Sequence, residues 1–531
     1  MLLLYSLNVI PFLRKTDPAA AQRVVAMPCQ WSLASGPIAS RSTGTRIAPT
    51  FRQLRGMPVV YDLRSFIQRL EQDGELLRIG RPVRRRYEVA AVMAAVERER
   101  KAFLFEQVEG SPYPLVGGLL NKLERFGLAL GQDPARFGDA EFDALLEQAK
   151  ASPLAPVEVA AAPAQAVVHT GADVDLDSLP VPVFFEHDTG PFITAAIGIT
   201  KHPDTGVYNV GVYRTLVTGR SECVINASSM SDLRQNYAAW EASGQPMPIA
   251  LAIGCDPAML TAAACKLPPG VCEYDVGGAL QGRPIELVKA VSHDLLVPAT
   301  AEFIIEGMVD FSRRVENLLG EFAGQYGPEN APVTRVTAIT HRQEPYFYSI
   351  LAGRNPEHNT LGSVAVYGVQ RSVEAAIRDA VPEAKRMHVF LEPGLGTLAH
   401  VVISIDKQSD DQPQDIIRRA FAGGGHIFPV GMIVKRIIVV DEDIDVADLA
   451  DVEWAIWNRA ATERKFVLIP EVQSWELERA AKAGQKSVRV GIDATMDLED
   501  VDKLIRPVTP GADEVRLEDD VTPPSGKQSA A

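Results

Sequence analysis

Two acidic residues five positions apart, Glu316 and Glu321, enclose a short run that ends in Gly320. Earlier in the chain, the segment Asn209-Val-Gly-Val-Tyr-Arg214 ends in an arginine. A guanidinium can hold a ligand carboxylate through two hydrogen bonds. Two carboxyl groups beside it separate their pKa values, so that one of them donates a proton near neutral pH. These residues therefore indicate chemistry on a carboxylic acid.

Spacing alone leaves a second interpretation of the two acids open. In a helix, Glu316 and Glu321 would lie about 140° apart, so they converge only if Gly320 ends the element. The alternative is a solvated loop in which both acids accompany Arg313 and Arg314. A turn at Gly320 would make a shared site possible.

The arginine segment raises a similar question of geometry. Residues 207–217 are rich in β-branched side chains and predict one strand. In a regular strand Asn209 and Arg214 would point to opposite faces, because their spacing is odd. A bulge at Gly211 would change that parity.

The composition is that of a globular protein with small-molecule ligands. The chain has 531 residues, of which 46% are hydrophobic and 23% charged, and this length predicts two to four domains. A net charge of -15 argues against a nucleic-acid or anionic-membrane partner. No apolar run reaches the roughly 18 residues that a spanning helix needs.

The cysteine pattern favours a reducing compartment. Five cysteines without a CxxC pair form neither a disulfide framework nor a structural zinc site. We therefore expect a cytoplasmic protein. The cysteines are Cys29, Cys223, Cys255, Cys265 and Cys272.

Both ends of the chain differ from its middle. Residues 1–56 carry seven Lys or Arg and one acid, hence +6, which leaves -15 - 6 = -21 for the rest. We expect this segment to be disordered or an upstream extension from a mis-assigned start, the alternative being a transit peptide. Residues 511–531 are acidic and poor in apolar side chains, and we expect a disordered tail.

Between these ends the pattern predicts an α+β protein of three domains. Residues 57–165 open with a helix over 63–70, capped by Asp62 and stopped by Gly74, and form an α/β domain. Residues 166–345 are rich in short strands with few helices, which favours an antiparallel barrel or sandwich. Strands and helices alternate again over residues 346–510, which predicts a C-terminal α/β domain.

Other common signatures are weak. Gly394-Leu-Gly396 and Gly423-Gly-Gly425 lack the strand, turn and helix context of a dinucleotide site. The nine histidines are scattered, and a single one is more often a structural residue than a metal ligand.

An ordered set of motifs resembles the UbiD family of prenylated-FMN-dependent decarboxylases, which includes ferulic acid decarboxylase. The resemblance extends from about Met57 to Val508. The motifs are Asn209-Val-Gly-Val-Tyr-Arg214, Gly254-Cys-Asp-Pro257, Glu273, Val297-Pro-Ala-Thr-Ala-Glu302, Glu316 to Glu321 with Gly324-Gln-Tyr-Gly327, Ala338-Ile-Thr-His341, Lys435 before Val439-Val-Asp-Glu-Asp, and Gly491-Ile-Asp-Ala-Thr495.

The resemblance implies a fold, a reaction and a set of cofactors. The central domain would be a split β-barrel like that of flavin reductases, and the C-terminal α/β domain would mediate oligomerisation as a dimer or hexamer. The reaction would be a reversible, non-oxidative decarboxylation of an aromatic, heteroaromatic or α,β-unsaturated acid. Prenylated FMN would be the cofactor, with Mn2+ and K+ at its phosphate, and a UbiX-type flavin prenyltransferase would supply it.

The resemblance also implies roles for individual residues. The catalytic network would be Arg214, Glu316 and Glu321, with Arg214 holding the substrate carboxylate and Glu321 donating the proton. The residues implied to bind the cofactor are Asn209, Val212, Tyr213, Arg214, Asp232, Glu273 and Lys435, among which Lys435 would contact the phosphate and Asn209 and Glu273 would bind the metal.

One position departs from the family pattern. Members generally have a histidine ligand some twenty residues after the strand asparagine, and this chain has none there. Two alignments place either Asp232 or Met230 in that position. Asp232 suits a hard cation and Met230 does not, so Asn209, Asp232 and Glu273 form the predicted metal set.

Two further functions stay open at the level of sequence. One is a non-catalytic flavin-binding homologue or an accessory subunit of a decarboxylase, and the other is a flavin reductase. The substrate is not defined, although Leu318-Leu319 within the acid segment favours heteroaromatic or benzoic acids over cinnamic ones.

Overall fold

The computed structural model describes residues 60–229, 231–268, 270–321, 323–390, 400–425, 427–481, 484–503, 506–507 and 509–510. The chain forms two compact units, Met1–Gly368 and Val369–Ala531, and the boundary falls within helix α8 (Pro356–Ala380). The expected N-terminal extension and C-terminal tail lie outside the described residues.

Helix α1 (Leu63–Gln72) opens the first unit where the sequence predicts it. The Asp62 carboxylate accepts from the Ser65 amide at 2.9 Å, and the Ser65 side chain caps the Asp62 backbone in return. Gly74 follows the helix with φ +67°. The apolar stripe of the helix, Leu63, Phe66, Ile67 and Leu70, is buried. The predicted helix, its cap and its stop are confirmed.

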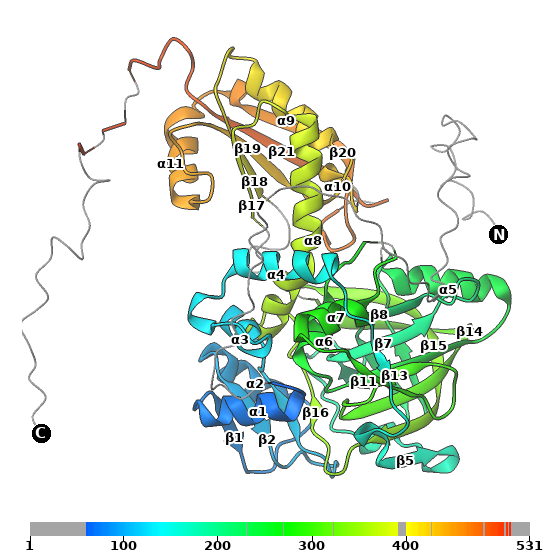
Figure 1. The fold of residues 1–531 in the computed structure, drawn as a ribbon. Helices are drawn as coiled ribbons and strands as arrows, with labels where there is room; N and C mark the ends of the chain where they lie inside the picture. The colour runs from blue at the N-terminus through cyan, green and yellow to red at the C-terminus, as the bar shows by residue number, and fades with distance from the viewer. Residues whose placement is uncertain are drawn as a thin grey trace, which may run out of the picture. The chain divides into compact units, whose positions relative to one another are not determined.

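The first unit begins with a four-stranded mixed sheet in the order β1-β2-β3-β16. Strands β1 and β2 are parallel, whereas β2 and β3 are antiparallel. Figure 1 shows α1 and α2 beside this sheet. The elements are β1 (Leu76–Ile79), α2 (Glu88–Arg98), β2 (Ala102–Phe105), β3 (Leu115–Gly117), α3 (Leu123–Ala129), α4 (Asp139–Ala151) and β16 (Phe347–Tyr348).

A nine-stranded antiparallel sheet forms the centre of the first unit. Its path is β6-β9-β10-β15-β14-β11-β7-β8, with β5 paired to β15, and the described strands do not close into a barrel. The strands are β5 (Val167–Thr170), β6 (Phe192–Ile193), β7 (Ala196–Lys201), β8 (Tyr208–Val212), β9 (Thr215–Gly219), β10 (Glu222–Ile225), β11 (Met247–Ile253), β14 (Phe303–Gly320) and β15 (Tyr326–His341).

The long hairpin β14–β15 is the main element that the sequence did not predict. Glu316 lies within β14, opposite Asn330, so neither a helix nor a surface loop contains it. The strand ends at Gly320, where a Cβ atom would lie 2.6 Å from the Phe185 ring. Glycine is therefore needed at the end of this strand, and the chain turns directly after it.

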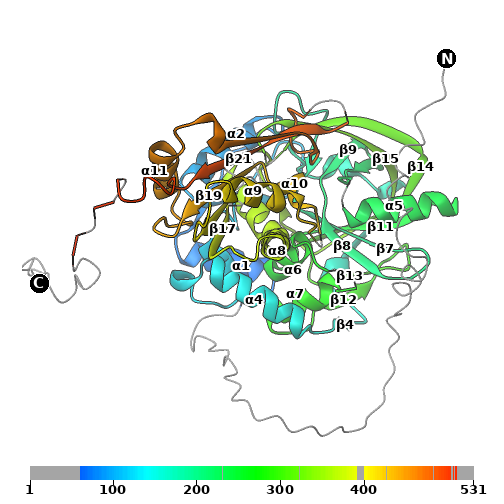
Figure 2. The same ribbon diagram turned by 90° about the horizontal axis from the view of Figure 1, so that it is seen from above.

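The central part of the unit contains more helix than predicted. Helix α5 (Asp232–Ser243) contacts β7, β8 and β11, and Figure 2 shows it beside these strands. Helices α6 (Pro257–Ala264) and α7 (Glu273–Gln281) pack against each other and against β8. A small sheet completes this part, with strands β4 (Val157–Glu158), β12 (Glu286–Lys289) and β13 (Leu296–Pro298).

The second unit is a five-stranded mixed sheet covered by helices. Ile438 and Val440 of β19 share an apolar cluster with Val452 of α11. On the other face of the sheet, a Cβ at Gly491 of β21 would lie 2.2 Å from Ile417 of α9. The elements are β17 (Arg386–Phe390), β18 (His400–Ile405), α9 (Gln412–Ala422), α10 (Val430–Ile433), β19 (Arg436–Asp441), α11 (Leu449–Arg459), β20 (Phe466–Gln473) and β21 (Lys486–Ala494).

Mixed α+β architecture is therefore present in both units. Among the described helices, none combines the length and the apolar character that crossing a bilayer requires.

Candidate active site

Arg214 occupies a link between two strands. The predicted single strand over residues 207–217 is wrong, because β8 ends at Val212 and β9 begins at Thr215. The register between β7 and β8 runs through Gly211 without a shift, so the structure has no bulge there. Because Arg214 lies outside both strands, its side chain does not follow the alternation of side chains between the two faces of the sheet. It can therefore turn toward the β14–β15 hairpin.

An ion pair joins Arg214 to Glu321. The distance from Arg214 Nη2 to Glu321 Oε1 is 2.6 Å, and the two side chains are only 22% and 5% exposed. The Glu321 amide donates to the Gln325 carbonyl at 2.7 Å, which holds the acid at the start of the hairpin turn. A charge-assisted hydrogen bond with so little solvent contact is stronger than a surface ion pair.

A pair of buried amides ties the arginine link to β14. The Asn226 Nδ2 donates to Asn317 Oδ1 at 2.7 Å, and the Asn317 Nδ2 donates to Asn226 Oδ1 at 3.0 Å. The Asn226 backbone amide also donates to the Arg214 carbonyl at 3.0 Å. Asn226 therefore connects the backbone of Arg214 to the strand that leads to Glu321.

His358 lies close enough to this ion pair to be influenced by both charges. Its Nδ1 is 3.2 Å from the Gly353 carbonyl, so Nδ1 carries the proton and Nε2 keeps a lone pair. Burial, with a smaller contribution from the positive charge of Arg214, lowers the pKa of His358 to about 4 against the opposing effect of Glu321. His358 is consequently a neutral imidazole at physiological pH.

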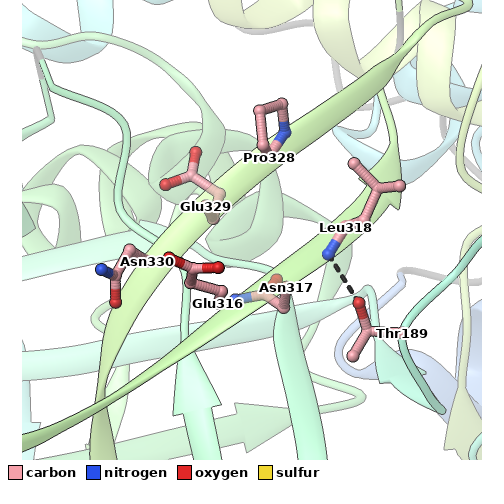
Figure 3. Close-up of a pocket in the computed structure, with 7 residues that line it drawn as sticks. All are labelled: Thr189, Glu316, Asn317, Leu318, Pro328, Glu329 and Asn330. Atoms are coloured by element: carbon pink, nitrogen blue, oxygen red, sulfur yellow. Dashed lines mark hydrogen bonds between the residues drawn. The ribbon is translucent and has the colours of Figure 1, made fainter.

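Glu316 lines a surface groove along the β14–β15 hairpin. Glu316 lies within β14, whereas Glu321 follows the end of the strand, and the Glu316 side chain is exposed. The groove has a volume of about 520 Å³, and Figure 3 shows Glu316 beside Asn330 and below Glu329. Within the described residues no hydrogen bond or ion pair links Glu316 to Arg214. The groove lining consists of Thr189, Glu316, Asn317, Leu318, Pro328, Glu329 and Asn330.

The predicted cofactor-phosphate residues form a second cluster around the end of β8. Asn209 is buried, and its side chain and the Tyr213 hydroxyl are 3.2 Å apart. Val212 is the last residue of β8. Glu273 begins helix α7, and burial, with a smaller contribution from the negative charge of Asp232, raises its pKa to about 7.

Asp232 faces a lysine across this cluster. Lys266 Nζ lies 2.7 Å from both Asp232 carboxylate oxygens. The alternative ligand, Met230, lies outside the described residues. Glu273 Oε2 is buried without a hydrogen-bond partner among the described residues. Two carboxylates and one amide supply only oxygen ligands, and a buried acceptor without a donor suits a hard cation.

Lys435 belongs to the second unit. Its ammonium forms an ion pair with Glu478 and donates to the Ser487 hydroxyl at 2.8 Å. A phosphate bound by Lys435 would compete with the Glu478 carboxylate.

The sequence interpretation missed three residues of these clusters. His358 and Asn226 carry no local pattern that relates them to Arg214, Glu321 or Asn317, which are distant in sequence. A weak signal was present for Lys266, since a lysine within an apolar stretch, Ala262 to Pro269, requires an acidic partner.

Three family models match consecutive parts of the chain. They describe the N-terminal domain, the Rift-related domain and the C-terminal domain of 3-octaprenyl-4-hydroxybenzoate carboxy-lyase, and they match residues 67–145, 156–355 and 365–494. The matched residues cover more than half of the chain. The protein belongs to the UbiD family of carboxy-lyases.

Solved structures agree with this membership. The UbiD-class enzyme HmfF from Pelotomaculum thermopropionicum, in complex with FMN, is 33% identical with a TM-score of 0.72 over 86% of this chain and 100% of that chain. The closed form of vanillic acid decarboxylase from Sedimentibacter hydroxybenzoicus is 27% identical, with a TM-score of 0.72 over 86% and 98%. The 3,4-dihydroxybenzoic acid decarboxylase AroY from Klebsiella pneumoniae is 25% identical, with a TM-score of 0.70 over 87% and 99%. The chain is therefore a decarboxylase of this class.

Proposed function

We propose that this protein reversibly decarboxylates an aromatic or heteroaromatic carboxylic acid with the help of prenylated FMN. The buried ion pair between Arg214 and Glu321 carries the proposal. It combines a carboxylate-binding group with an acid in a position protected from solvent. A binding module has no need for such a pair.

Arg214 binds and orients the substrate carboxylate in this mechanism. The arriving carboxylate competes with Glu321 for the guanidinium, and Glu321 in its carboxylic acid form is the proton donor. When the bond to CO2 breaks, Glu321 donates a proton to the ring carbon, so that the substrate carboxylate and one proton become the decarboxylated product and CO2. In the reverse direction Glu321 removes the proton from that carbon.

Prenylated FMN, when bound, supplies the electron sink that stabilises the carbanion. The proposal for its phosphate site is supported by the oxygen donors Asn209, Asp232 and Glu273, which suit Mn2+, with K+ nearby. Val212 and Tyr213 would border the flavin at the end of β8, and Lys435 would contact the phosphate. We further propose that residues 166–345 correspond to a split barrel, and that a UbiX-type flavin prenyltransferase supplies the cofactor.

The substrate class is proposed from two features. Two similar enzymes are decarboxylases of vanillic acid and of 3,4-dihydroxybenzoic acid. Leu318 lines the groove, whereas Leu319 is buried in the core. These features favour benzoic and heteroaromatic acids. Glu316 remains a candidate third member of the catalytic network, and it would have to reach the substrate from the groove side of β14.

A homo-oligomer built through the second unit is also proposed. Its exposed surface carries large apolar side chains, of which Trp457 is 86% and Leu468 is 66% exposed. We propose that contact between copies of the chain buries these two side chains. A dimer or a hexamer in the cytoplasm would cover these side chains.

We also propose domain limits of 57–165, 166–345 and 346–510.

Reconstitution tests the proposal. The full chain is co-expressed with a flavin prenyltransferase, and CO2 release and solvent deuterium exchange are followed over hydroxybenzoic, furoic and pyrrole carboxylic acids. We expect turnover or exchange for at least one acid. Bound cofactor without exchange for any acid would favour the non-catalytic homologue, and NAD(P)H-dependent flavin reduction would favour a flavin reductase. Unchanged activity in Glu316→Gln would remove Glu316 from the network.

A further inference from the structure

Lys266 and Asp232 form a symmetrical ion pair within the proposed cation site. The ammonium is 2.7 Å from each carboxylate oxygen, so it occupies both atoms that a metal ion would use. The side chains are 28% and 46% exposed, and solvent ions can therefore reach the pair. Gln235 Nε2 also donates to Asp232 Oδ1 at 3.2 Å, which fixes the orientation of the carboxylate.

Lys266 supplies a positive charge where the chain gathers negative ones. Asp232 and Glu273 lie close enough for their charges to interact. Acidic groups that share a site need a counter-charge. Lys266 provides it from the loop that follows helix α6, without any ion from solvent.

We propose that Lys266 competes with the divalent cation for Asp232 and is the resident cation of this cluster when no metal is bound. This inference rests on the proposed function, because it concerns the cation site of the proposed cofactor. A cation that binds must displace the ammonium or share Asp232 with it. Repulsion between a divalent ion and an ammonium at such distances weakens metal binding by a factor on the order of ten.

The experiment measures Mn2+ binding to the flavin-free full-length protein after EDTA treatment. Electron paramagnetic resonance of free aqueous Mn2+ gives the dissociation constant without any enzyme turnover. Lys266→Met should bind Mn2+ about tenfold more tightly than the wild type. Lys266→Gln, which also removes the charge, gives the same reading if the methionine variant folds poorly, as judged by circular dichroism.

Lys101→Met is the matched control. Lys101 pairs with Glu75 at 2.8 Å and is 32% exposed, so it resembles Lys266 in exposure but lies outside the cluster. We expect its Mn2+ affinity to stay within twofold of the wild type. In an Asp232→Asn background the gain from Lys266→Met should vanish, because the carboxylate that the two cations share has been removed.

Equal or weaker Mn2+ binding by Lys266→Met would overturn the inference, and so would a protein that binds no Mn2+. The proposed function is judged separately, by decarboxylation or exchange with prenylated FMN. An active enzyme whose Mn2+ affinity does not respond to Lys266 refutes only the competition. An inactive enzyme with the expected Mn2+ response refutes only the proposed function.

Discussion

Arg214 and Glu321, which are 107 residues apart in the chain, meet at 2.6 Å in a nearly buried ion pair. Neither residue lies inside a regular strand: Arg214 follows β8, and Glu321 follows β14. The ends of two strands therefore position both side chains. The sheet holds these ends in place, but the residues beyond them do not follow the alternation of side chains between the two faces of a sheet. In the proposed mechanism this arrangement would provide a carboxylate-binding group and a proton donor for one substrate.

Replacing Glu321 by glutamine should abolish the reaction. The amide keeps a hydrogen bond to Arg214 but cannot donate a proton, so kcat should fall by roughly 10²–10⁴-fold. CO2 release and solvent deuterium exchange measure the loss. Flavin binding, followed by fluorescence quenching, should remain at the wild-type level. Full activity of Glu321→Gln would remove Glu321 as the proton donor.

The Asn226–Asn317 pair should show strong coupling in stability. Either single change to leucine leaves a buried amide without a partner and should lower the free energy of unfolding by about 1–3 kcal/mol. The double variant should be more stable than the sum of the single losses predicts. Urea unfolding of the four proteins gives the coupling. If the pair positions Arg214 through the Asn226 backbone, both single variants should also raise KM. Additive losses of stability would contradict the paired geometry.

We predict that His358 contributes to turnover through its Nε2 atom. Because Nδ1 donates to Gly353, His358→Asn can retain that bond, whereas His358→Phe loses both nitrogens. We expect kcat/KM to fall about tenfold or more in both variants, and the Tm to fall mainly in the phenylalanine variant. Wild-type kcat/KM in His358→Asn would show that only the Gly353 contact matters.

The pH dependence of His358 has a defined sign. Its folded pKa of about 4 is below the ordinary value of 6.5, because burial and Arg214 disfavour the charged form. The unfolded chain therefore binds the proton first, and this histidine should reduce stability as the pH falls from about 6.5 to about 4. His358→Asn should flatten the loss over that window in thermal unfolding. An unchanged acid slope would contradict the neutral imidazole.

A buried acid pair predicts a pH effect of opposite sign. Glu357 accepts from the Gly118 amide at 2.6 Å, the Leu120 amide at 2.8 Å and the Tyr348 hydroxyl at 2.8 Å. Glu97 Oε2 accepts from the Glu357 amide at 2.8 Å, whereas its Oε1 is buried without a hydrogen-bond partner among the described residues. Burial, with the negative charge of Glu357, raises the pKa of Glu97 to about 8.

The folded protein therefore keeps a proton on Glu97 that the unfolded chain releases above about pH 4.5. The stabilising contribution is complete below that pH and is lost as the pH rises toward 8. Glu97→Gln imitates the protonated acid and should remove this slope, which chemical unfolding at pH 5 and pH 8 would measure. Glu357→Gln weakens the hydrogen bonds from three donors and should cost about 1–3 kcal/mol. It also removes the negative charge that helps to raise the pKa of Glu97, so it should reduce the slope as well. An unaltered slope in Glu97→Gln would mean that Glu97 is ionised.

The exposed apolar surface of the second unit should mediate assembly. A charge at Leu468 opposes burial against another copy, so Leu468→Glu should shift the protein toward smaller species. Light scattering coupled to size-exclusion chromatography measures the mass. Val168→Glu changes a residue of the first unit that is also exposed, at 49%, and should leave the mass unchanged. An identical mass for Leu468→Glu would exclude this surface as the interface.

Local sequence was sufficient to predict those elements whose start, apolar spacing and end are encoded by neighbouring residues. Helix α1 is confirmed from Asp62 to Gly74, because its cap, its apolar spacing and its stop all lie within a dozen residues. The β14–β15 hairpin was missed because its polar residues and its length, 18 residues in β14, do not resemble an average strand.

By itself the sequence determined the family, because many motifs in a fixed order identify it. It also determined the residue types that chemistry on a carboxylic acid needs. Only the tertiary structure decided which of two acids Arg214 holds. Spacing cannot decide this, because the break between β8 and β9 and the end of β14 at Gly320 depend on pairing with distant strands and on the Phe185 ring. The same holds for Lys266 and Asp232, whose contact arises only when the loop after α6 meets the start of α5.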